Sequence, residues 1–404
     1  MATAQTSVPT VALADITSAA ESLPLLHHVR DTAPIAWLPE LHGYLFTRRA
    51  DVVALLKDRR LDSGNPTQSF AGLSQEQLAQ LRPLAECITM WMGHTTPEGH
   101  LRFQLLLKQY FTPAAMEKLR PRVRQITKEL LDAVADAGRM EVVHDLAFPL
   151  PANIIAEMFG MPVEDRHLLR VWSGSIGAVF NQSSFEDLLA AQRGIGEFQD
   201  YLRVLVERRR GELGEDLISE LLRAEGEGRI STEEIVANCV LLLFAGHETT
   251  AGVITHGLGL LLDHPDQLAL LRDNPELGKS AVEEMLRYDG TVHAVVRTVA
   301  EPIEFEGHQF EVGDRFYLSL LAANHDPAHI DDPDRFDIAR DRNVHVAFGV
   351  GLFYCLGASL ARVETSECLR VLLERFPDAH WDGDPEWSLI PPLGHRMERL
   401  PMAY

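Results

Sequence analysis

The hydrophobic and polar positions along the chain follow mainly the period of an α-helix. Over most of the length, apolar residues recur three and four positions apart, and charged residues fill many of the positions between them. The pattern predicts helices at residues 50–57, 99–110, 120–137, 151–158, 185–210 and 217–224. Periodicity alone therefore indicates a protein built mostly from helices.

The longest predicted helix begins at Ser231. Ser231 and Glu234 have the spacing of a capping box, and about thirty residues, or roughly 45 Å of helix, follow before His264-Pro265 ends it. Residues 239–245 are apolar on every side, which predicts a helix buried all round. This dense run is far shorter than the ~20 residues that cross a bilayer, so we expect no membrane span.

Short extended segments predict a small amount of sheet. They cover residues 35–37, 44–47, 303–305, 309–312 and 316–320, and Gly307 and Gly313 stand at turn positions between the last three. A final long helix is predicted at 356–376. No repeat or Gly/Ser linker divides the chain, so we expect one domain over residues 1–404, mainly α with a small β subdomain, preceded by a flexible N-terminus at 1–20.

Composition and charge narrow the possible functions. The chain has 37 Lys and Arg against 59 Asp and Glu, a net charge of −22, which disfavours binding to nucleic acid. Four dispersed cysteines do not form a disulfide framework, and the first thirty residues lack the pattern of a signal peptide. We therefore expect a soluble cytoplasmic protein.

A glycine-bearing segment around Cys355 is the strongest candidate for chemistry. In Ala347-Phe-Gly-Val-Gly-Leu-Phe-Tyr-Cys-Leu-Gly357, two glycines two positions apart and a third after the cysteine predict a tight turn that leads into a helix. A cysteine at a helix N-terminus lies near unpaired backbone N–H groups, which lower its pKa and favour the thiolate. Such a thiolate suits a metal centre; the alternative is a buried structural cysteine beside a turn.

This segment resembles the haem-binding loop of the cytochrome P-450 family, and three further motifs stand in the order and spacing of that family. Ala245-Gly-His-Glu-Thr249 resembles its oxygen-binding signature, Glu284-Met-Leu-Arg287 its Glu-x-x-Arg pair, and Pro333-Asp-Arg-Phe336 the segment that supplies a second arginine to that pair. The resemblance covers nearly the whole chain. It implies the cytochrome P-450 fold, a triangular prism of helices around a buried haem b.

The resemblance also implies which residues hold the haem. Cys355 would be the axial thiolate ligand of the iron, which favours O–O cleavage, and Phe348 would shield its sulfur from water. His100 and Arg297 match residues that bind the haem propionates. The residues expected to contact the haem are His100, Ala245, Arg297, Phe348, Gly349, Cys355 and Gly357.

Two positions depart from the pattern of the family. Gln104 stands where the family usually has Arg, and Phe353 stands where it usually has His or Arg. Both usual cations contact propionates, so we expect the propionates to be held differently here, with Arg102 or His94 as substitutes. The loop that carries Phe353 lies beneath the face that receives the redox partner in that family. Phe353 therefore also changes what we expect of that face.

Glu248 and Thr249 are expected to move protons. The two are adjacent on a helix, hence about 100° apart around its axis, and face different directions. If Thr249 points to the oxygen-binding side of the haem, Glu248 points towards a water route, and the two act in series as a relay. Gly246 is expected to open a groove beside the haem, and His247 to face solvent or a neighbouring helix.

Glu284 and Arg287 lie three residues apart on one helix face. As an exposed pair they would contribute only about 0.2–0.5 kcal/mol. By resemblance, Arg335 joins them in a buried charge network that supports the haem from its proximal side. We interpret this network as structural.

The expected substrate pocket is mostly apolar. By position, Leu241 and Phe244 would face the distal side of the haem, and His293 and Val295 would line one wall. Met92, with its neighbours Met90 and Trp91, would cover another, and His293 could orient the substrate as a polar handle. Such a pocket suits a terpenoid, steroid, fatty acid or polyketide.

The favoured function is a monooxygenase that activates O₂ with two electrons and hydroxylates or epoxidises a hydrophobic molecule. The chain has no dinucleotide fingerprint and no length for a flavin domain, so its electrons would come from a ferredoxin or flavodoxin with its reductase. One alternative is a peroxide-using or non-oxygenating enzyme of the same fold. Another is a haem-binding sensor or carrier without turnover. We expect a monomer.

Overall fold

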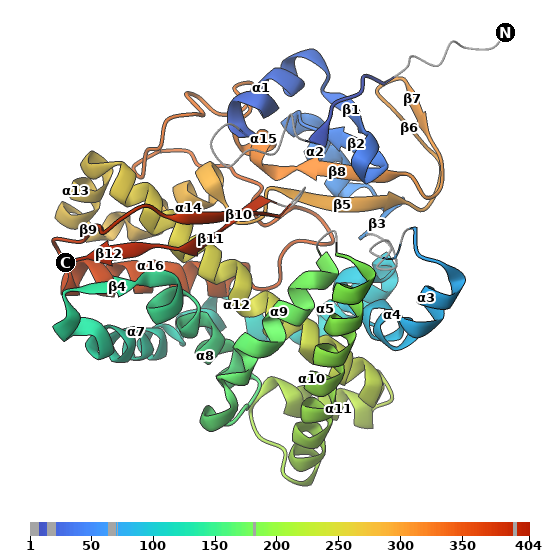
Figure 1. The fold of residues 1–404 in the computed structure, drawn as a ribbon, viewed down its shortest axis with the longest axis horizontal. Helices are drawn as coiled ribbons and strands as arrows, with labels where there is room; N and C mark the ends of the chain where they lie inside the picture. The colour runs from blue at the N-terminus through green and yellow to red at the C-terminus, as the bar shows by residue number, and fades with distance from the viewer. Residues whose placement is uncertain (1–7, 14–21, 64–69, 71, 181–182, 391–393) are drawn as a thin grey trace.

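The computed structural model describes residues 8–13, 22–63, 70, 72–180, 183–390 and 394–404. Helices make up most of the molecule, and the sheets gather on one side of it (Figure 1). The predicted fold class, mainly helical with a small sheet fraction, is confirmed. The predicted flexible N-terminus at 1–20 lies outside the described residues except for 8–13, and the assignment of a single domain stays a prediction.

The helices predicted with bounds agree with α2, α5, α7, α8, α10, α11, α12 and α16 to within a few residues at each end, and the structure adds helices that the pattern did not predict. Their bounds are α1 Ser22–Thr32, α2 Arg49–Lys57, α3 Gln75–Gln80, α4 Arg82–Thr89, α5 Pro97–Leu107, α6 Pro113–Glu117, α7 Arg120–Val134, α8 Pro149–Met158, α9 Leu168–Phe180, α10 Phe185–Gly211, α11 Leu217–Gly226, α12 Thr232–Asp263, α13 Pro265–Asp273, α14 Gly278–Asp289, α15 Leu320–Asn324 and α16 Ala358–Arg375.

Helix α12 is the core helix. Its predicted capping box is present, since the Glu234 amide donates to Ser231 Oγ at 3.2 Å and the Ser231 amide donates to the Glu234 carboxylate at 2.9 Å. It packs against α8, α10, α14 and α16. Helix α12 is long and apolar enough to cross a membrane by length and hydropathy, contrary to what the short run 239–245 suggested, but 61% of its most apolar window is buried inside the protein. This burial is typical of a core helix.

Twelve strands form four small sheets among the described residues. Their bounds are β1 Ile35–Leu38, β2 Gly43–Phe46, β3 Leu61–Asp62, β4 Arg139–Glu141, β5 Ala294–Val299, β6 Ile303–Phe305, β7 His308–Phe310, β8 Arg315–Ser319, β9 His380–Trp381, β10 Glu386–Ile390, β11 Gly394–Arg399 and β12 Pro401–Ala403. The largest sheet has the order β1-β2-β8-β5-β3, in which β2 and β8 are parallel. Strands β10 and β11 form an antiparallel hairpin.

A buried amide ties the segment before α5 to the core helix. Asn238 of α12 accepts a hydrogen bond from the Met92 amide at 2.7 Å and donates one to the Met90 carbonyl at 2.7 Å. The imidazole of His100 on α5 lies 2.8 Å from the Met92 carbonyl. These bonds hold the start of α5 beside α12, where the candidate site lies.

Candidate active site

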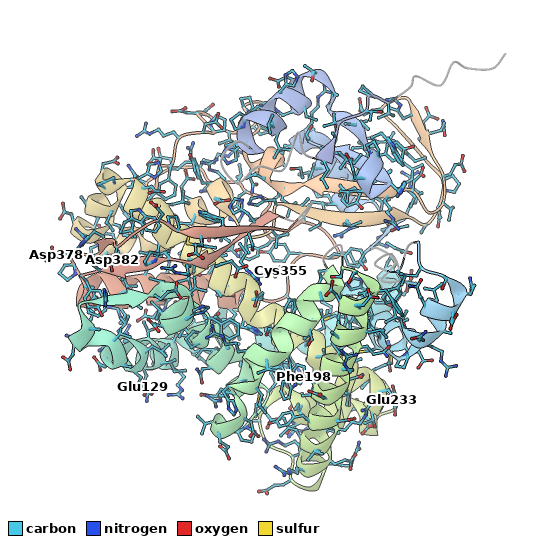
Figure 2. The ribbon with its side chains drawn as sticks, in the orientation of Figure 1. Glu129, Phe198, Glu233, Cys355, Asp378 and Asp382 are labelled. Atoms are coloured by element: carbon cyan, nitrogen blue, oxygen red, sulfur yellow. The ribbon has the colours of Figure 1, made fainter. Side chains whose placement is uncertain are left out.

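The loop before α16 presents Cys355 from a tight, glycine-dependent turn. Gly349 and Gly351 have φ values of +67° and +79°, which disfavour residues with a side chain. The Cys355 amide donates to the Phe348 carbonyl at 3.0 Å, which closes the loop. In the view of Figure 2, Cys355 lies near the centre of the molecule. The predicted turn leading into a helix is therefore confirmed.

The thiol of Cys355 is accessible to solvent and at the same time closely surrounded by protein. The residue is exposed to solvent, yet protein atoms surround it deeply enough that burial raises the pKa of the thiol. The backbone N–H groups of Gly357 and Ala358 and the charge of Arg362 act in the opposite direction. The sequence predicted a lowered pKa for this thiol; burial outweighs the helix N-terminus. The other three cysteines are buried.

Phe348 lies within a network of charged side chains. The Arg362 guanidinium stands 4.6 Å from the centre of the Phe348 ring, a cation–π distance. Arg362 pairs with Glu283, and His345 lies 3.0 Å from the same carboxylate. These two partners hold the pKa of Glu283 at about 2 in spite of burial. The network fixes the ring beneath the cysteine loop.

Arg297 is a buried cation for which the described residues provide no carboxylate. It stands on β5, its Nη1 donates to the neighbouring Val296 carbonyl at 2.8 Å, and burial lowers its pKa to about 10. Its guanidinium lies 4.8 Å from the centre of the Phe353 ring. The same ring also contacts His100, with ring centres 4.6 Å apart. Phe353 thus contacts both predicted propionate-binding residues, Arg297 and His100.

Neither Arg102 nor His94 replaces the propionate-binding cations that are missing at positions 104 and 353. Arg102 is not available, because its guanidinium pairs with Glu234 and donates to the Arg229 carbonyl on an exposed surface. Burial lowers the pKa of His94 to about 4, so His94 is a neutral imidazole. Gln104 has turned to the cysteine loop, where it donates to the Leu352 carbonyl at 3.4 Å. Arg297 therefore carries the positive charge near Phe353.

Ala245 and Thr249 are exposed although the helix that carries them is largely buried. They stand four residues apart, so they share one accessible face of α12. Thr249 Oγ1 donates to the Ala245 carbonyl at 3.0 Å, and the helix continues through this turn without a break. This hydrogen bond fixes the orientation of the Thr249 hydroxyl, and the residue is also accessible to solvent.

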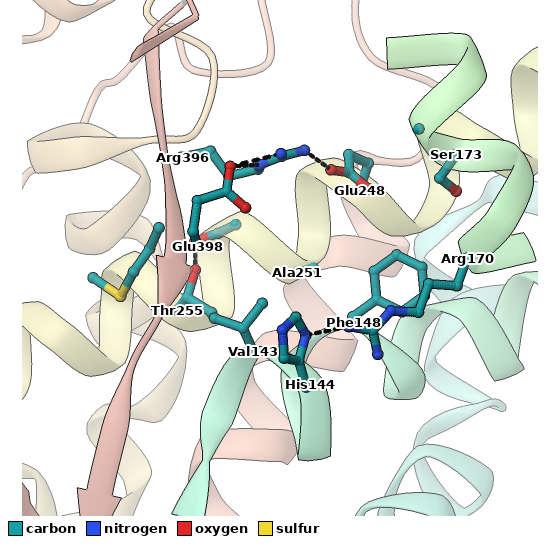
Figure 3. A pocket seen from close by; sticks show the side chains of 13 residues that line it. Val143, His144, Phe148, Arg170, Ser173, Glu248, Ala251, Thr255, Arg396 and Glu398 are labelled. Carbon is teal, nitrogen blue, oxygen red and sulfur yellow. Dashed lines mark hydrogen bonds and ion pairs between the residues drawn. The ribbon is translucent and has the colours of Figure 1, made fainter. Parts of the chain in front are cut away.

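Glu248 points in a different direction, as predicted, into a pocket of about 210 Å³ that charged and apolar side chains line together. Its Oε1 accepts from Arg396 Nη1 of β11 at 2.7 Å, and Arg396 also pairs with Glu398 (Figure 3). His144 and Arg170 line the same cavity. Nothing in the sequence singled out Arg396, because it lies in a strand that the sequence analysis did not predict.

Gly246 and His247 are committed to packing between helices. A Cβ atom at Gly246 would lie 2.7 Å from Cγ1 of Ile155, so this glycine allows α8 to approach α12. The predicted role of Gly246, a groove beside the haem, is thus wrong. His247 lies 2.7 Å from Ser173 Oγ of α9, which confirms that it faces a neighbouring helix.

The Glu-x-x-Arg pair forms a buried network, but with a different third member. Glu284 and Arg287 are fully buried and joined by two hydrogen bonds of 2.8 Å. Arg340 completes the network at 3.2 Å from Glu284, with 12% of its side chain exposed. The prediction for Arg335 is wrong, since that side chain is 62% exposed and pairs with Asp337. Phe336 is buried, which turns its neighbour Arg335 outward.

The predicted substrate-pocket residues fall into two groups. Leu241 and Met92 are buried in the main core, and Phe244 stacks on Phe180 with ring centres 5.8 Å apart. Val295 on β5 is partly exposed. His293 is instead held by Asp289, whose carboxylate lies 3.0 Å from its Nε2, so the structure disagrees with its expected role as a polar handle for substrate.

Known proteins share this fold and much of this sequence. The profile of the family "Cytochrome P450" matches residues 100–387. The chain is 42% identical over 320 residues to cytochrome P450 monooxygenase PikC of Streptomyces venezuelae, covering 78% of this chain and 76% of that protein. It is 38% identical over 356 residues to 6-deoxyerythronolide B hydroxylase of Saccharopolyspora erythraea, covering 86% and 87%.

A solved structure extends the similarity to the whole fold. The crystal structure of P450BioI in complex with hexadec-9Z-enoic acid ligated acyl carrier protein superposes with a TM-score of 0.88 at 32% identity. The match covers 95% of this chain and 98% of that one.

Proposed function

The chain belongs to the cytochrome P450 family, which makes it a haem-dependent monooxygenase with a hydrophobic substrate and a redox partner, and from this premise we propose a role for each residue of its site. The supporting observation is that the Cys355 thiol is accessible to solvent on a tight glycine turn, while the buried Arg297 lacks a carboxylate among the described residues. A thiolate ligand and a buried cation for a propionate are what a haem requires.

The donor set fits haem b at three points. Cys355 Sγ would ligate the iron, and the backbone N–H groups of Gly357 and Ala358 would stabilise the anionic sulfur. Arg297 would pair with one propionate. His100 Nε2 is buried near the Leu352 backbone without a hydrogen bond of ordinary geometry, so it is open to the other propionate. Phe348 and Gly349 belong to the same loop and would contact the haem.

When bound, haem supplies activation of O₂ with two electrons; the chain supplies protons. Thr249 Oγ1, released from the Ala245 carbonyl, presents its proton on the accessible face of α12. Glu248, on the adjacent position, reaches the pocket beside Arg396 and would take up a proton there. The hydroxyl and the carboxyl would therefore pass a proton from this pocket to the accessible face of α12, as a relay.

We propose an apolar substrate of the polyketide, steroid or fatty acid class. An aromatic cluster stands next to Met92: Phe180 stacks on both Trp91 and Phe244, with ring centres 5.8 Å away in each case. The names of two relatives support this class, one a hydroxylase of 6-deoxyerythronolide B and one bound to a fatty acyl carrier protein.

A ferredoxin or flavodoxin would deliver the electrons to an apolar patch on α5 and the cysteine loop. Leu101, Leu105 and Tyr354 are 42%, 51% and 43% exposed. Helix α5 contacts the loop through His100 on Phe353, which places these side chains on adjoining elements. A patch of exposed apolar residues marks an interaction site. We further propose that the protein is monomeric and cytoplasmic.

Two measurements test this function. The reduced protein with carbon monoxide should give the absorption band of a thiolate-ligated haem, and Cys355→Ala should abolish it. A panel of polyketide, steroid and fatty acid compounds should include one that shifts the ferric Soret band to high spin and is converted to an oxygenated product with NADPH, a surrogate ferredoxin and its reductase.

The alternatives give different outcomes in the same assay. Product with hydrogen peroxide but not with the ferredoxin system identifies a peroxide-using enzyme. A thiolate spectrum with no turnover by either route, across substrates that shift the spectrum, identifies a haem-binding carrier or sensor. Either result would overturn the proposed monooxygenase cycle.

A further inference from the structure

Three histidines surround one aspartate outside the catalytic relay. His256 of α12 places Nδ1 at 3.4 Å from Asp289 Oδ2, and His395 of β11 places Nε2 at 3.1 Å from the same oxygen. His293 Nε2 binds the other carboxylate oxygen at 3.0 Å. The three elements meet here because α12 packs against both α14 and β11, as Figure 1 shows.

The ligand atoms have the spacing of a metal site. The chosen atoms of His256, Asp289 and His395 all lie within 4.8 Å of one another. A tetrahedral zinc ion with bonds of about 2.1 Å separates neighbouring ligand atoms by roughly 3.4 Å, close to the two distances from Asp289. The Asp289 carbonyl, 3.3 Å from His256 Nδ1, offers a further oxygen.

The surroundings favour a cation as well. The side chains of His256 and His395 are 1% and 10% exposed, and no arginine or lysine of the described segments forms an ion pair with Asp289. His293 binds Asp289 Oδ1, the oxygen that does not face the other two histidines, and so orients the carboxylate. Partners of metal-bound carboxylates commonly act in this way. The ring of Trp387 covers both imidazoles, with ring centres 4.7 Å from His395 and 5.1 Å from His256.

We propose that His256, Asp289 and His395 bind a divalent transition metal, with zinc as the occupant. Imidazole nitrogens and a carboxylate are ligands that zinc accepts, and two neutral imidazoles with one carboxylate leave its charge partly uncompensated, as in open zinc sites. The bound ion would clamp the β10–β11 hairpin to α12 and to the end of α14. This site is separate from the iron ligand Cys355 and does not depend on the proposed catalytic roles.

A second group of the same composition provides an internal control. His27, His325 and Asp334 also lie within 4.8 Å of one another. There, however, both nitrogens of His325 already have partners, Asp334 and the Tyr288 carbonyl, and the Arg30 guanidinium lies 2.7 Å from His27 Nδ1. An adjacent cation opposes metal binding, so we expect zinc at the first group only.

The test uses the haem-loaded protein, stripped with a chelator and titrated with zinc sulfate alone. We expect one zinc per chain, with affinity lowered at least 100-fold in His256→Gln and in His395→Gln and unchanged in His27→Gln. Soret absorbance and far-UV circular dichroism check that each variant is folded. Zinc that fails to bind, or that binds equally well to His395→Gln, would overturn the proposal.

A second measurement covers the case in which a variant does not fold. Zinc K-edge absorption of the His27→Gln holoenzyme reports on the ligands without interference from the haem iron. Two imidazole nitrogens near 2.0–2.1 Å plus oxygen would support the site. A shell of oxygen atoms alone, or loss of the zinc with His27, would contradict it.

Discussion

Thr249 carries the one hydroxyl group that is both exposed and hydrogen-bonded on the accessible face of α12 around Ala245. Replacing it with alanine removes the proton donor but leaves the helix intact. We expect Thr249→Ala to lower product formation by about 10²-fold, the lower end of what a positioned proton donor contributes, while NADPH is still consumed and peroxide or water is released instead.

The serine variant is the matched control for this prediction. Thr249→Ser keeps the hydroxyl and should retain most of the coupling between NADPH consumption and product. Product per NADPH and peroxide release are the two readouts. Unchanged coupling in Thr249→Ala would remove this residue from the relay.

Arg335 and Arg340 show that a sequence motif does not predict which of two nearby arginines turns inward. Both arginines stand in one loop, and the motif pointed to the wrong one because residue spacing does not say which side chain turns inward. Arg340→Gln should lower the free energy of unfolding by about 2 kcal/mol, since it removes a hydrogen-bonded partner from the fully buried Glu284.

The exposed arginine is the control for this stability change. Arg335→Gln should change the free energy of unfolding by no more than about 0.5 kcal/mol, because its side chain lies on the surface. Urea unfolding of the two holoproteins measures both. Equal losses in the two variants would restore Arg335 to the network.

At the scale of an element, α16 carries two buried glutamates whose pKa values shift in opposite directions. Three arginines, Arg120, Arg124 and Arg370, surround Glu367 and hold its pKa at about 2. Glu364 has no hydrogen-bond partner among the described residues, and burial raises its pKa well above the ordinary value. The same helix therefore contains one group that favours folding at higher pH and one that favours it at lower pH.

The pH dependence of stability follows from these two directions. A raised pKa means that the folded state keeps its proton, so the contribution of Glu364 is complete below about pH 4.5 and declines as pH rises, by up to about 1.4 kcal/mol per pH unit. Glu364→Gln should flatten the fall in stability between pH 5 and 8. The contribution of Glu367 is present above pH 4.5 and is lost as pH falls towards 2, so Glu367→Gln should flatten the acid limb.

Urea unfolding across this pH range measures both slopes. The two variants serve as controls for each other, because each should alter one limb and leave the other unchanged. A Glu364→Gln protein with the wild-type slope above pH 5 would show that Glu364 is ionised in the folded state.

Periodicity predicted the helices better than the strands, for a physical reason. Helix α12 has a capping box and a proline stop, which are local signals, and its bounds agree with the prediction within a residue or two. Strand β5 has no alternation of buried and exposed positions, because its residues face the sheet interior and the site at irregular intervals. The strands β5, β10 and β11 escaped prediction, and Arg297 and Arg396 belong to them.

At the scale of the whole molecule, the net charge of −22 says little about where the redox partner binds. The apolar patch of Leu101, Leu105 and Tyr354 gives a local test. Leu105→Glu should slow reduction by the ferredoxin about tenfold, since a charge placed within a docking patch costs about 1.4 kcal/mol or more. Stopped-flow reduction in the presence of carbon monoxide measures the rate.

An exposed residue on another helix, α10, serves as control. Val204→Glu on α10 introduces the same charge at a similarly exposed position, 53% against 51% for Leu105. It should leave the reduction rate unchanged. Similar slowing in both variants would mean that added charge, and not the patch, affects the partner.

One short strand of the protein has a consequence for how the chain is synthesised. Strand β12 lies between β4 and β9, so residues 401–403 provide the central member of a sheet whose first strand, β4, left the ribosome about 260 positions earlier. Until residues 401–403 have been synthesised, β4 and β9 have exposed edges without a neighbour, and chains stalled before this point would associate with one another through those edges. The synthesis of this one strand thus protects the nascent polypeptide from aggregation.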